Sequence, residues 1–135
     1  MVTGAHCRHD QGRDSGITDV AGMRGKKVGV WCCGNENELY AALVKNGIDP
    51  KNKDDVTIVN QPFDMNLFLD KQIDAAAAMT YNELAQVLET ENPDTGEPYS
   101  LDDLNVISME DAGTAMLEDG VFVRGDWIAD EANQD

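Results

Sequence analysis

The sequence is short of basic residues and contains no long apolar run. Its 135 residues include 10 Lys and Arg against 26 Asp and Glu, which gives a formal net charge of −16. Such a chain offers no basic stripe for nucleic-acid phosphates and no polybasic patch for anionic lipids, so we expect it to bind no nucleic acid. The longest weakly polar run, from Ala75 to Met79, has five residues. A membrane-spanning helix needs roughly 18 apolar residues, so we expect none.

Cysteine and histidine are scarce as well. The three cysteines, Cys7, Cys32 and Cys33, do not make a disulfide framework in a chain of this length. The adjacent pair lacks the C-x-x-C spacing of a zinc or thioredoxin site, so we interpret it as part of a cleft wall at the end of a strand. Both histidines, His6 and His9, lie near the N-terminus, which leaves no Ser–His–Asp or Cys–His arrangement elsewhere. We therefore expect no catalytic residues, no metal and no cofactor.

The composition is that of one globular domain, because hydrophobic residues make up 41% of the chain. Residues 1–14 show neither hydrophobic periodicity nor the apolar segment of a signal peptide, so we interpret them as an unpatterned leader. Acidic charge is concentrated in the second half: residues 68–135 hold 17 acidic and 2 basic residues, against 9 and 8 in residues 1–67. A solvated surface is the simpler interpretation of this excess, and an acidic docking surface is the alternative.

From residue 26 onward, short β-type runs alternate with helical patterns. The pattern predicts strands at 26–31, 56–59, 73–79, 106–107 and 121–123, and helices within 35–46, 62–72 and 82–89 and from 126 onward. Residues 92–98 form a turn-rich excursion. Alternating strands and helices form right-handed βαβ units. We therefore predict an α/β fold, a three-layer lobe with a parallel-rich central sheet covered on both faces.

Three of the predicted strands end in polar loops, at 31–35, 60–62 and 80–83. In an open parallel sheet a ligand lies beyond the carboxyl ends of the strands. The first and the last of these loops carry the side chains best suited to hold a ligand. The candidate ligand-binding residues are Trp31, Gly34, Asn35, Tyr81, Asn82 and Glu83.

The first of these loops begins a helix. Asn35 can cap the helix N-terminus while Glu38 reaches back as its partner in a capping box, and this is the simpler interpretation. In the alternative, backbone N–H groups from Gly34 onward face a ligand. Glu36 and Glu38 already occupy the positive end of the helix dipole, so a neutral polar ligand fits better there than a phosphate.

The last loop places Tyr81 and Glu83 on either side of Asn82, where a strand turns into a helix. This spacing can aim a phenol and a carboxylate at the same cleft. A carboxylate suits a ligand with amino donors, and the aromatic rings of Tyr81 and Trp31 suit a flat heterocycle. In the alternative, Asn82 or Thr80 caps the helix and Glu83 is simply a residue of its first turn.

Several separated segments resemble one known family. Residues 15–31 are similar to the entry into the second lobe of type II periplasmic binding proteins, in the group that handles nitrate, sulfonate, taurine and thiamine-precursor pyrimidines. The pyrimidine-binding branch also includes the fungal thiamine pyrimidine synthases. It is resembled by four further segments, 31–36, 60–66, 80–84 and 113–117. The resemblance covers roughly residues 15–131 and carries expectations for fold, partners and site.

Members of this family have two α/β lobes that close on a ligand. The resemblance implies that residues 15–135 are the second lobe, a fragment of a two-lobe protein whose missing first lobe is a partner. It also implies the substrate-binding component of an ABC importer, with an ABC permease as partner. The full-length protein would be periplasmic, or extracellular and membrane-anchored. Tyr81 and Glu83 would contact the pyrimidine, and Gly34 and Asn35 would lie where the synthases hold a phosphate.

Two alternatives remain within the resemblance. The synthases carry a cysteine-rich run near the position of residues 113–123, which contain no cysteine here, and they need a histidine from the first lobe. These departures favour a binding protein over an enzyme of thiamine pyrimidine biosynthesis. A sulfonate-, nitrate- or taurine-binding protein is the other alternative.

Overall fold

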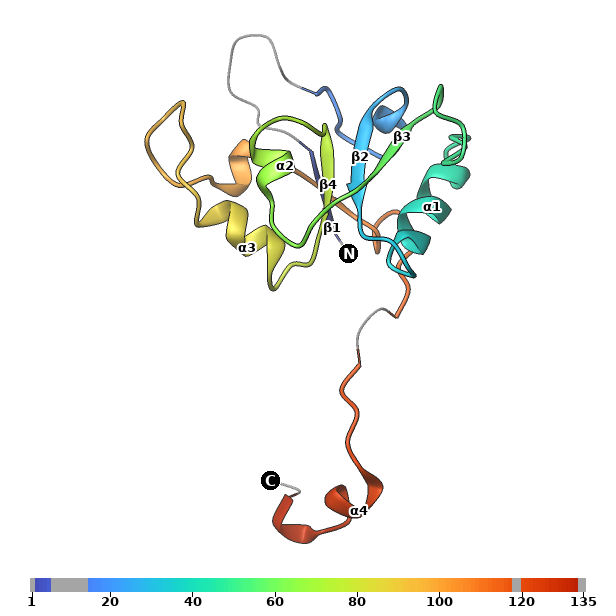
Figure 1. Ribbon diagram of the computed structural model, residues 1–135, viewed down its shortest axis with the longest axis vertical. Coiled ribbons are helices and arrows are strands. Elements are labelled where there is room, and N and C mark those ends of the chain that lie inside the picture. Colours follow the sequence, from blue (N-terminus) through green and yellow to red (C-terminus); the bar gives the residue numbers. More distant parts are fainter. Residues whose placement is uncertain (1, 6–14, 118–119, 134–135) are drawn as a thin grey trace.

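The computed structural model describes residues 2–5, 15–117 and 120–133 (Figure 1). Its strands are β1 (Val2–Ala5), β2 (Lys27–Val30), β3 (Thr57–Asn60), β4 (Ala75–Ala78) and β5 (Asn105–Ser108). Its α-helices are α1 (Glu36–Lys45), α2 (Asn66–Leu69), α3 (Glu83–Leu88) and α4 (Gly125–Ile128). Single turns of 3₁₀ helix lie at Ala21–Met23, Leu101–Asp103 and Glu131–Asn133.

All five strands form one sheet, in the order β3-β2-β4-β1-β5. β2 is parallel to β3 and β4, whereas β1 runs antiparallel to both of its neighbours. Helix α1 covers one face of the sheet, and α2 and α3 cover the other (Figure 1). This three-layer lobe with a parallel core of three strands confirms the α/β fold predicted from the alternation of patterns.

Strand β4 shows why a run of alanines forms a strand here. Ala75 and Ala77 belong to the apolar cluster that includes α1, and Ala76 and Ala78 belong to the cluster that includes α2 and α3. All four side chains are buried. A strand that is buried on both faces needs no polar alternation, because neither face meets water.

The contact between β2 and β4 depends on a glycine. A Cβ added at Gly29 would lie 2.5 Å from Gln61 Oε1 and 2.6 Å from Ile73 Cδ1. The Gln61 side chain passes over this bare position and reaches β4, where it donates to Ala77 O (2.8 Å) and accepts from Ala77 N–H (3.1 Å). Because the β2–β4 pairing ends at Gly29 and Ala76, Gln61 continues the hydrogen bonding of β4 toward its carboxyl end.

The interpretation of residues 1–14 as an unpatterned leader is wrong in one part. Val2–Ala5 form β1, which pairs with β4 on one side and with β5 on the other. Four residues are too few to show a period, and the neighbours of such a strand decide its place more than its own sequence does. Residues 6–14, with His6, Cys7 and His9, lie outside the described residues.

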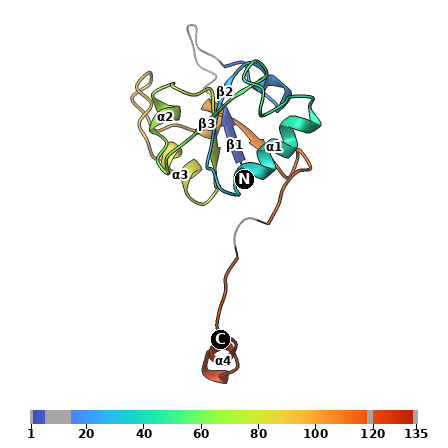
Figure 2. The same ribbon diagram turned by 45° about the vertical axis from the view of Figure 1, so that its right-hand side comes forward.

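The strand predicted at residues 121–123 does not form. Residues 120–133 lie away from the sheet and include α4 (Figures 1 and 2). Val121 and Phe122 are 96% and 93% exposed. A β-prone run becomes a strand only where a partner strand accepts and donates its backbone hydrogen bonds, and within the described residues none pairs with this segment.

Candidate functional site

A cleft opens at the carboxyl ends of the adjacent parallel strands β2 and β4. The loop after β2 leads to α1 on one face of the sheet, and the loop after β4 leads to α3 on the opposite face. Two adjacent parallel strands whose connections diverge in this way leave a crevice at their carboxyl ends. The cleft found there has a volume of about 260 Å³ and is lined by Trp31, Cys32, Asn35, Phe63, Met79, Tyr81, Asn82 and Glu83.

The structure brings five of the six predicted site residues into this one cleft. Gly34 is the exception, because it lines a neighbouring cavity of about 320 Å³ together with Cys33, Asn35, Asn37, Glu38, Met116 and Leu117. Asn35 borders both cavities. The placement agrees with the rule that pointed to these two loops, and the role of these residues in holding a ligand stays a prediction.

Two aromatic rings form one wall of the cleft. The Trp31 side chain is buried under the loop after β3, where its indole N–H donates to Pro62 O at 3.1 Å. Phe63 stacks on it with ring centroids 6.1 Å apart and 21° between the planes, yet Phe63 itself is 78% exposed. Trp31 is thus held rigidly, and Phe63 offers an aromatic surface to the solvent side of the cleft.

Sequence reasoning missed Phe63 as a site residue. The signal was present, because the loop at residues 60–62 was recognised as polar and as lying at the same sheet edge. Phe63 follows it directly, after Pro62. An aromatic residue just beyond a strand end can line a cleft as Trp31 or Tyr81 does, but Phe63 also fits as one of the apolar residues of the helical pattern within residues 62–72.

The opposite wall comes from the turn between β4 and α3. Tyr81 is 71% exposed there, whereas Glu83 is only 2% exposed. The Glu83 carboxylate accepts from the Met79 backbone N–H (3.0 Å) and from the Asn82 side-chain amide (2.9 Å). Glu83 therefore fixes the turn that presents Tyr81. A carboxylate has about four acceptor positions, so two remain for a ligand donor that reaches it.

The predicted capping box at α1 is wrong. Asn35 makes no side-chain capping hydrogen bond, because its backbone is already helical (φ −71°, ψ −20°) and an N-cap residue normally lies outside the helical region. The backbone N–H of Gly34 donates instead to Glu36 Oε2 at 2.7 Å. The buried Glu38 carboxylate accepts from the Met116 backbone N–H, so it ties the chain after β5 to the start of α1.

The hydrogen bond between Gly34 and Glu36 affects both the charge at the start of α1 and the backbone N–H groups that could bind a ligand there. The hydrogen bond from the Gly34 N–H lowers the pKa of Glu36 below its ordinary value of 4.5. Glu36 is therefore anionic at neutral pH, and it occupies the Gly34 donor that a phosphate would need. The occupied donor is a physical reason to expect that this helix start is unsuited to a phosphate, and the expectation stays a prediction.

Cys32 and Cys33 are both exposed and unbridged. Cys32 lies on the wall of the cleft, and its backbone N–H donates to Asn60 Oδ1 at 3.2 Å. Cys33 has a left-handed backbone conformation with φ 74° and lines the neighbouring cavity. The neighbouring Cys32 thiol is the main cause that raises the pKa of Cys33.

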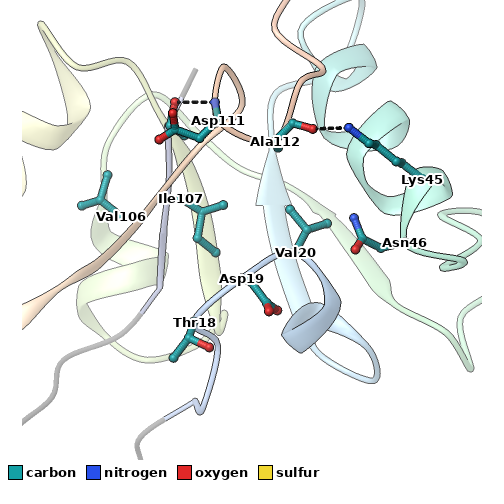
Figure 3. A pocket seen from close by; sticks show the side chains of 10 residues that line it. Thr18, Asp19, Val20, Lys45, Asn46, Val106, Ile107, Asp111 and Ala112 are labelled. Atoms are coloured by element: carbon teal, nitrogen blue, oxygen red, sulfur yellow. Dashed lines mark hydrogen bonds between the residues drawn. The ribbon is translucent and has the colours of Figure 1, made fainter.

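A further cavity of about 490 Å³ lies beside the C-terminal end of α1 and the edge strand β5 (Figure 3). The Lys45 ammonium group at its rim donates to Ala112 O at 2.7 Å, and the Asp111 N–H donates to Ser108 Oγ at 3.3 Å. Its lining contains no aromatic side chain. This cavity is larger than the cleft. Its Lys45 and Ser108 side chains, however, hydrogen-bond to nearby backbone groups, and without an aromatic side chain it has no surface that would select a flat ligand.

The described residues contain neither a cluster of metal-ligating side chains nor a membrane-spanning helix. No group of three or more His, Cys, Asp or Glu side chains gathers there in a way that could hold a metal ion. None of the helices described has the length and apolar character required to cross a bilayer.

Comparison with known proteins gives one result. No curated protein sequence and no solved structure matches the chain. The family model described as "NMT1/THI5 like" matches residues 11–134, which is nearly the whole chain. The match confirms the resemblance to thiamine-pyrimidine and sulfonate-type binding proteins seen in the sequence segments, and the chain belongs to the NMT1/THI5-like family.

Proposed function

We propose that this chain is part of the substrate-binding component of an ABC importer, and that its ligand is a small flat heterocycle such as a thiamine-precursor pyrimidine. Family membership supports a binding or thiamine-pyrimidine-related role. The observation that carries the finer proposal is the aromatic cleft at the carboxyl edge of the sheet.

The ligand class follows from the walls of the cleft. Phe63 and Tyr81 present large exposed rings on the loops after β3 and β4, and Trp31 supports Phe63 from below. Exposed aromatic surface is costly in water, and a flat ring that stacks on it gains about 0.5–1.5 kcal/mol beyond its buried area. Amide and carboxylate groups of Asn35, Asn82 and Glu83 supply directional partners for ring nitrogens and amines.

Charge separates the candidate ligands. Glu36 at the helix start and Glu83 on the cleft wall are carboxylates, and the chain as a whole carries a net charge of −16. A sulfonate or nitrate anion would be repelled by this field, whereas a neutral or protonated aminopyrimidine would not. We therefore favour an aminopyrimidine over taurine or nitrate.

The cleft is also small. Its volume of about 260 Å³ is below the roughly 300–1,000 Å³ of typical ligand sites. The exposed rings of Phe63 and Tyr81 would be covered if a second lobe closed over them, as in the two-lobe architecture that the family resemblance implies. We infer that the missing first lobe completes the site, and that the lone chain binds weakly.

The proposal assigns no catalytic step to this chain. The upstream coding sequence tests this choice: an export or lipobox signal supports an importer component, periplasmic or extracellular and membrane-anchored. A cytosolic start with a histidine-bearing first lobe would support an enzyme of thiamine pyrimidine biosynthesis instead.

The direct test is to titrate the chain separately with an aminopyrimidine, with taurine and with nitrate, and to monitor the backbone amide signals by NMR. We expect shifts at the two loops with the aminopyrimidine alone, at a Kd well above the micromolar range. Tyr81→Leu should weaken binding about twofold to tenfold, from the loss of a stacking partner. Tyr81→Phe keeps the ring and should retain most of the affinity.

An exposed apolar residue away from the cleft provides the matched control, because Val44→Ala removes a side chain on the surface of α1. Unchanged affinity of Tyr81→Leu would contradict the aromatic cleft. Preference for taurine or nitrate would contradict the pyrimidine assignment, and sub-micromolar binding by the lone chain would contradict the fragment interpretation.

A further inference from the structure

The outer edge of β5 can accept another strand. β5 is the last strand of the sheet, and among the described residues it pairs with β1 alone. An edge strand directs the N–H and C=O groups of every second residue away from the sheet, where an extended segment can add. Charged residues and proline often protect such an edge, and β5 contains neither. Val106 within it is 40% exposed.

The cavity of about 490 Å³ beside β5 offers room for apolar side chains (Figure 3). Its apolar lining comes from Val20, Val106 and Ile107. Its charged lining consists of two carboxylates, those of Asp19 and Asp111, and one ammonium group. That ammonium group, on Lys45, already donates to Ala112 O. The cavity therefore suits an apolar segment that carries a cation.

The C-terminal segment of the chain, residues 120–133, has this composition. Val121 and Phe122 are 96% and 93% exposed, and no strand among the described residues pairs with them. Arg124 follows this β-type run and is one of only two basic residues in residues 68–135. The segment lies away from the lobe of its own chain (Figures 1 and 2). One chain thus carries both a strand-like run without a partner strand and an open sheet edge.

We propose that two copies of this chain associate by exchanging these segments, so that residues 120–124 of each copy add to the outer edge of β5 in the other. The apolar side chains of the run enter the cavity, and Arg124 lies beside Asp111 of the other copy. Asp111 is the better partner, because the Asp19 carboxylate already accepts from the Gly22 N–H at 2.9 Å.

A second copy is the occupant favoured by these features, because each copy gives one segment and receives one. Such a reciprocal contact is isologous and closes into a two-fold dimer. The inference is independent of the proposed function, since the cavity beside β5 and the cleft with Trp31 and Tyr81 share no lining residue.

The expected dimer is weak. Each copy carries a net charge of −16, which opposes association, although at about 0.15 M salt charges more than about 8 Å apart are largely screened. The contact is small, so we expect a Kd on the order of 10–100 µM. Below this concentration the chain is monomeric, and the segment adds nothing to the stability of the lobe.

The test is analytical ultracentrifugation of the full chain in about 0.15 M salt with a reducing agent, from about 5 µM to about 1 mM. We expect a monomer–dimer equilibrium. Phe122→Ser should weaken it by on the order of 10²-fold, because the buried ring is lost at both contacts of the dimer. A chain that stops after Leu117 should stay monomeric. Val44→Ser, an exposed apolar residue on α1, is the matched control and should leave the Kd unchanged.

Exchange of the charges tests which face receives the segment. Arg124→Asp and Asp111→Arg should each weaken the dimer by on the order of 10-fold, because each places like charges together at both contacts. The double variant restores opposite charges, so its Kd should return to within about threefold of wild type. Circular dichroism checks that all variants keep the fold.

Four outcomes would overturn the proposal. They are a wild-type chain that stays monomeric at the highest concentration, a truncated chain or a Phe122→Ser variant that dimerises as well as wild type, a double charge variant no better than the single ones, and growth into higher oligomers instead of a closed dimer.

Discussion

Acidic side chains near the N-termini of α1 and α3 accept hydrogen bonds that fix the neighbouring loops. The Glu83 carboxylate accepts from the Met79 N–H and from Asn82, Glu36 accepts from the Gly34 N–H, and Glu38 accepts from the Met116 N–H. Backbone donors in such turns have no partner within the helix, and carboxylates satisfy them with charge-assisted bonds. These residues shape the loops that border the cleft, so their effects on folding and on binding must be measured separately.

The pKa of Glu36 gives a pH-dependent prediction at this scale. Its pKa in the folded chain lies below the ordinary value of 4.5, first because of the Gly34 N–H. A carboxyl group with a lowered pKa contributes stability above its unfolded pKa, and this is lost as pH falls through the folded pKa. The stability difference between wild type and Glu36→Gln should therefore be constant from neutral pH to about 5, and should shrink below 4.5.

Thermal unfolding of both proteins from pH 3 to pH 7 provides the measurement. The group is exposed, so the difference should be small, and its pH profile is more informative than its size. Glu97→Gln, at an exposed position in the turn at residues 92–98, is the control. A stability difference that grows as the solution is acidified would contradict the role given to the Gly34 N–H.

At the scale of elements, the apolar pattern of the sequence predicted those strands and helices whose apolar side chains are buried in the structure. β2, α1, β3, β4 and α3 were predicted within a few residues, because each has a strong apolar pattern or, for β4, an apolar run buried on both faces. β1 could not be predicted, since its four residues depend on β4 and β5 for their place. Residues 121–123 have the composition of a strand, but no strand among the described residues pairs with them, so they do not form one.

The site was predictable to a similar extent. The strand-end rule found the two loops that meet in the cleft, because it requires only that each strand and its carboxyl end be recognised in the sequence. The rule could not find the side-chain bonds within these loops. The failed capping box at Asn35 and the buried state of Glu83 depend on backbone angles and on distances that sequence spacing does not contain.

The β2–β4 contact provides a prediction for these elements. In Gly29→Ala, the new methyl group meets Gln61 and Ile73 at distances that force them to move. Overpacking of this kind costs about 1–3 kcal/mol in the free energy of unfolding. Displacement of Gln61 should also expose the Ala77 amide to solvent, so its hydrogen exchange should accelerate more than that of Leu43 in the core of α1.

Chemical denaturation with NMR-detected exchange measures both effects. Gly125→Ala is the matched control, because nothing lies within 4 Å of a Cβ there, and its stability should stay within about 0.5 kcal/mol of wild type. A Gly29→Ala protein as stable as this control would show that the Gln61 contact is unimportant.

For the whole molecule, the charge and the apolar surface are distributed unevenly. The lobe around the sheet holds two buried apolar clusters, whereas Leu117, Val121, Phe122 and Trp127 lie in the C-terminal segment with large exposed fractions. Apolar side chains gathered on one exposed segment mark a surface that favours association. Asp126, Asp130 and Glu131 lie in the same segment, and like charges of this kind oppose association.

Removal of the C-terminal segment tests whether the lobe folds without it. A chain that stops after Leu117 keeps both clusters and the Glu38–Met116 hydrogen bond. Its free energy of unfolding should stay within about 0.5 kcal/mol of that of the full chain, as for other surface changes. It should also bind less of an apolar dye, because most of the exposed apolar side chains of the segment are gone.

A chain that stops after Ile107 is the contrast, because it lacks Met109, which is fully buried, and it should not fold. Dye fluorescence and thermal unfolding are measured for the full chain and for both truncated chains. A large loss of stability on removing residues 118–135 alone would contradict the prediction, because it would mean that this segment packs against the lobe in solution.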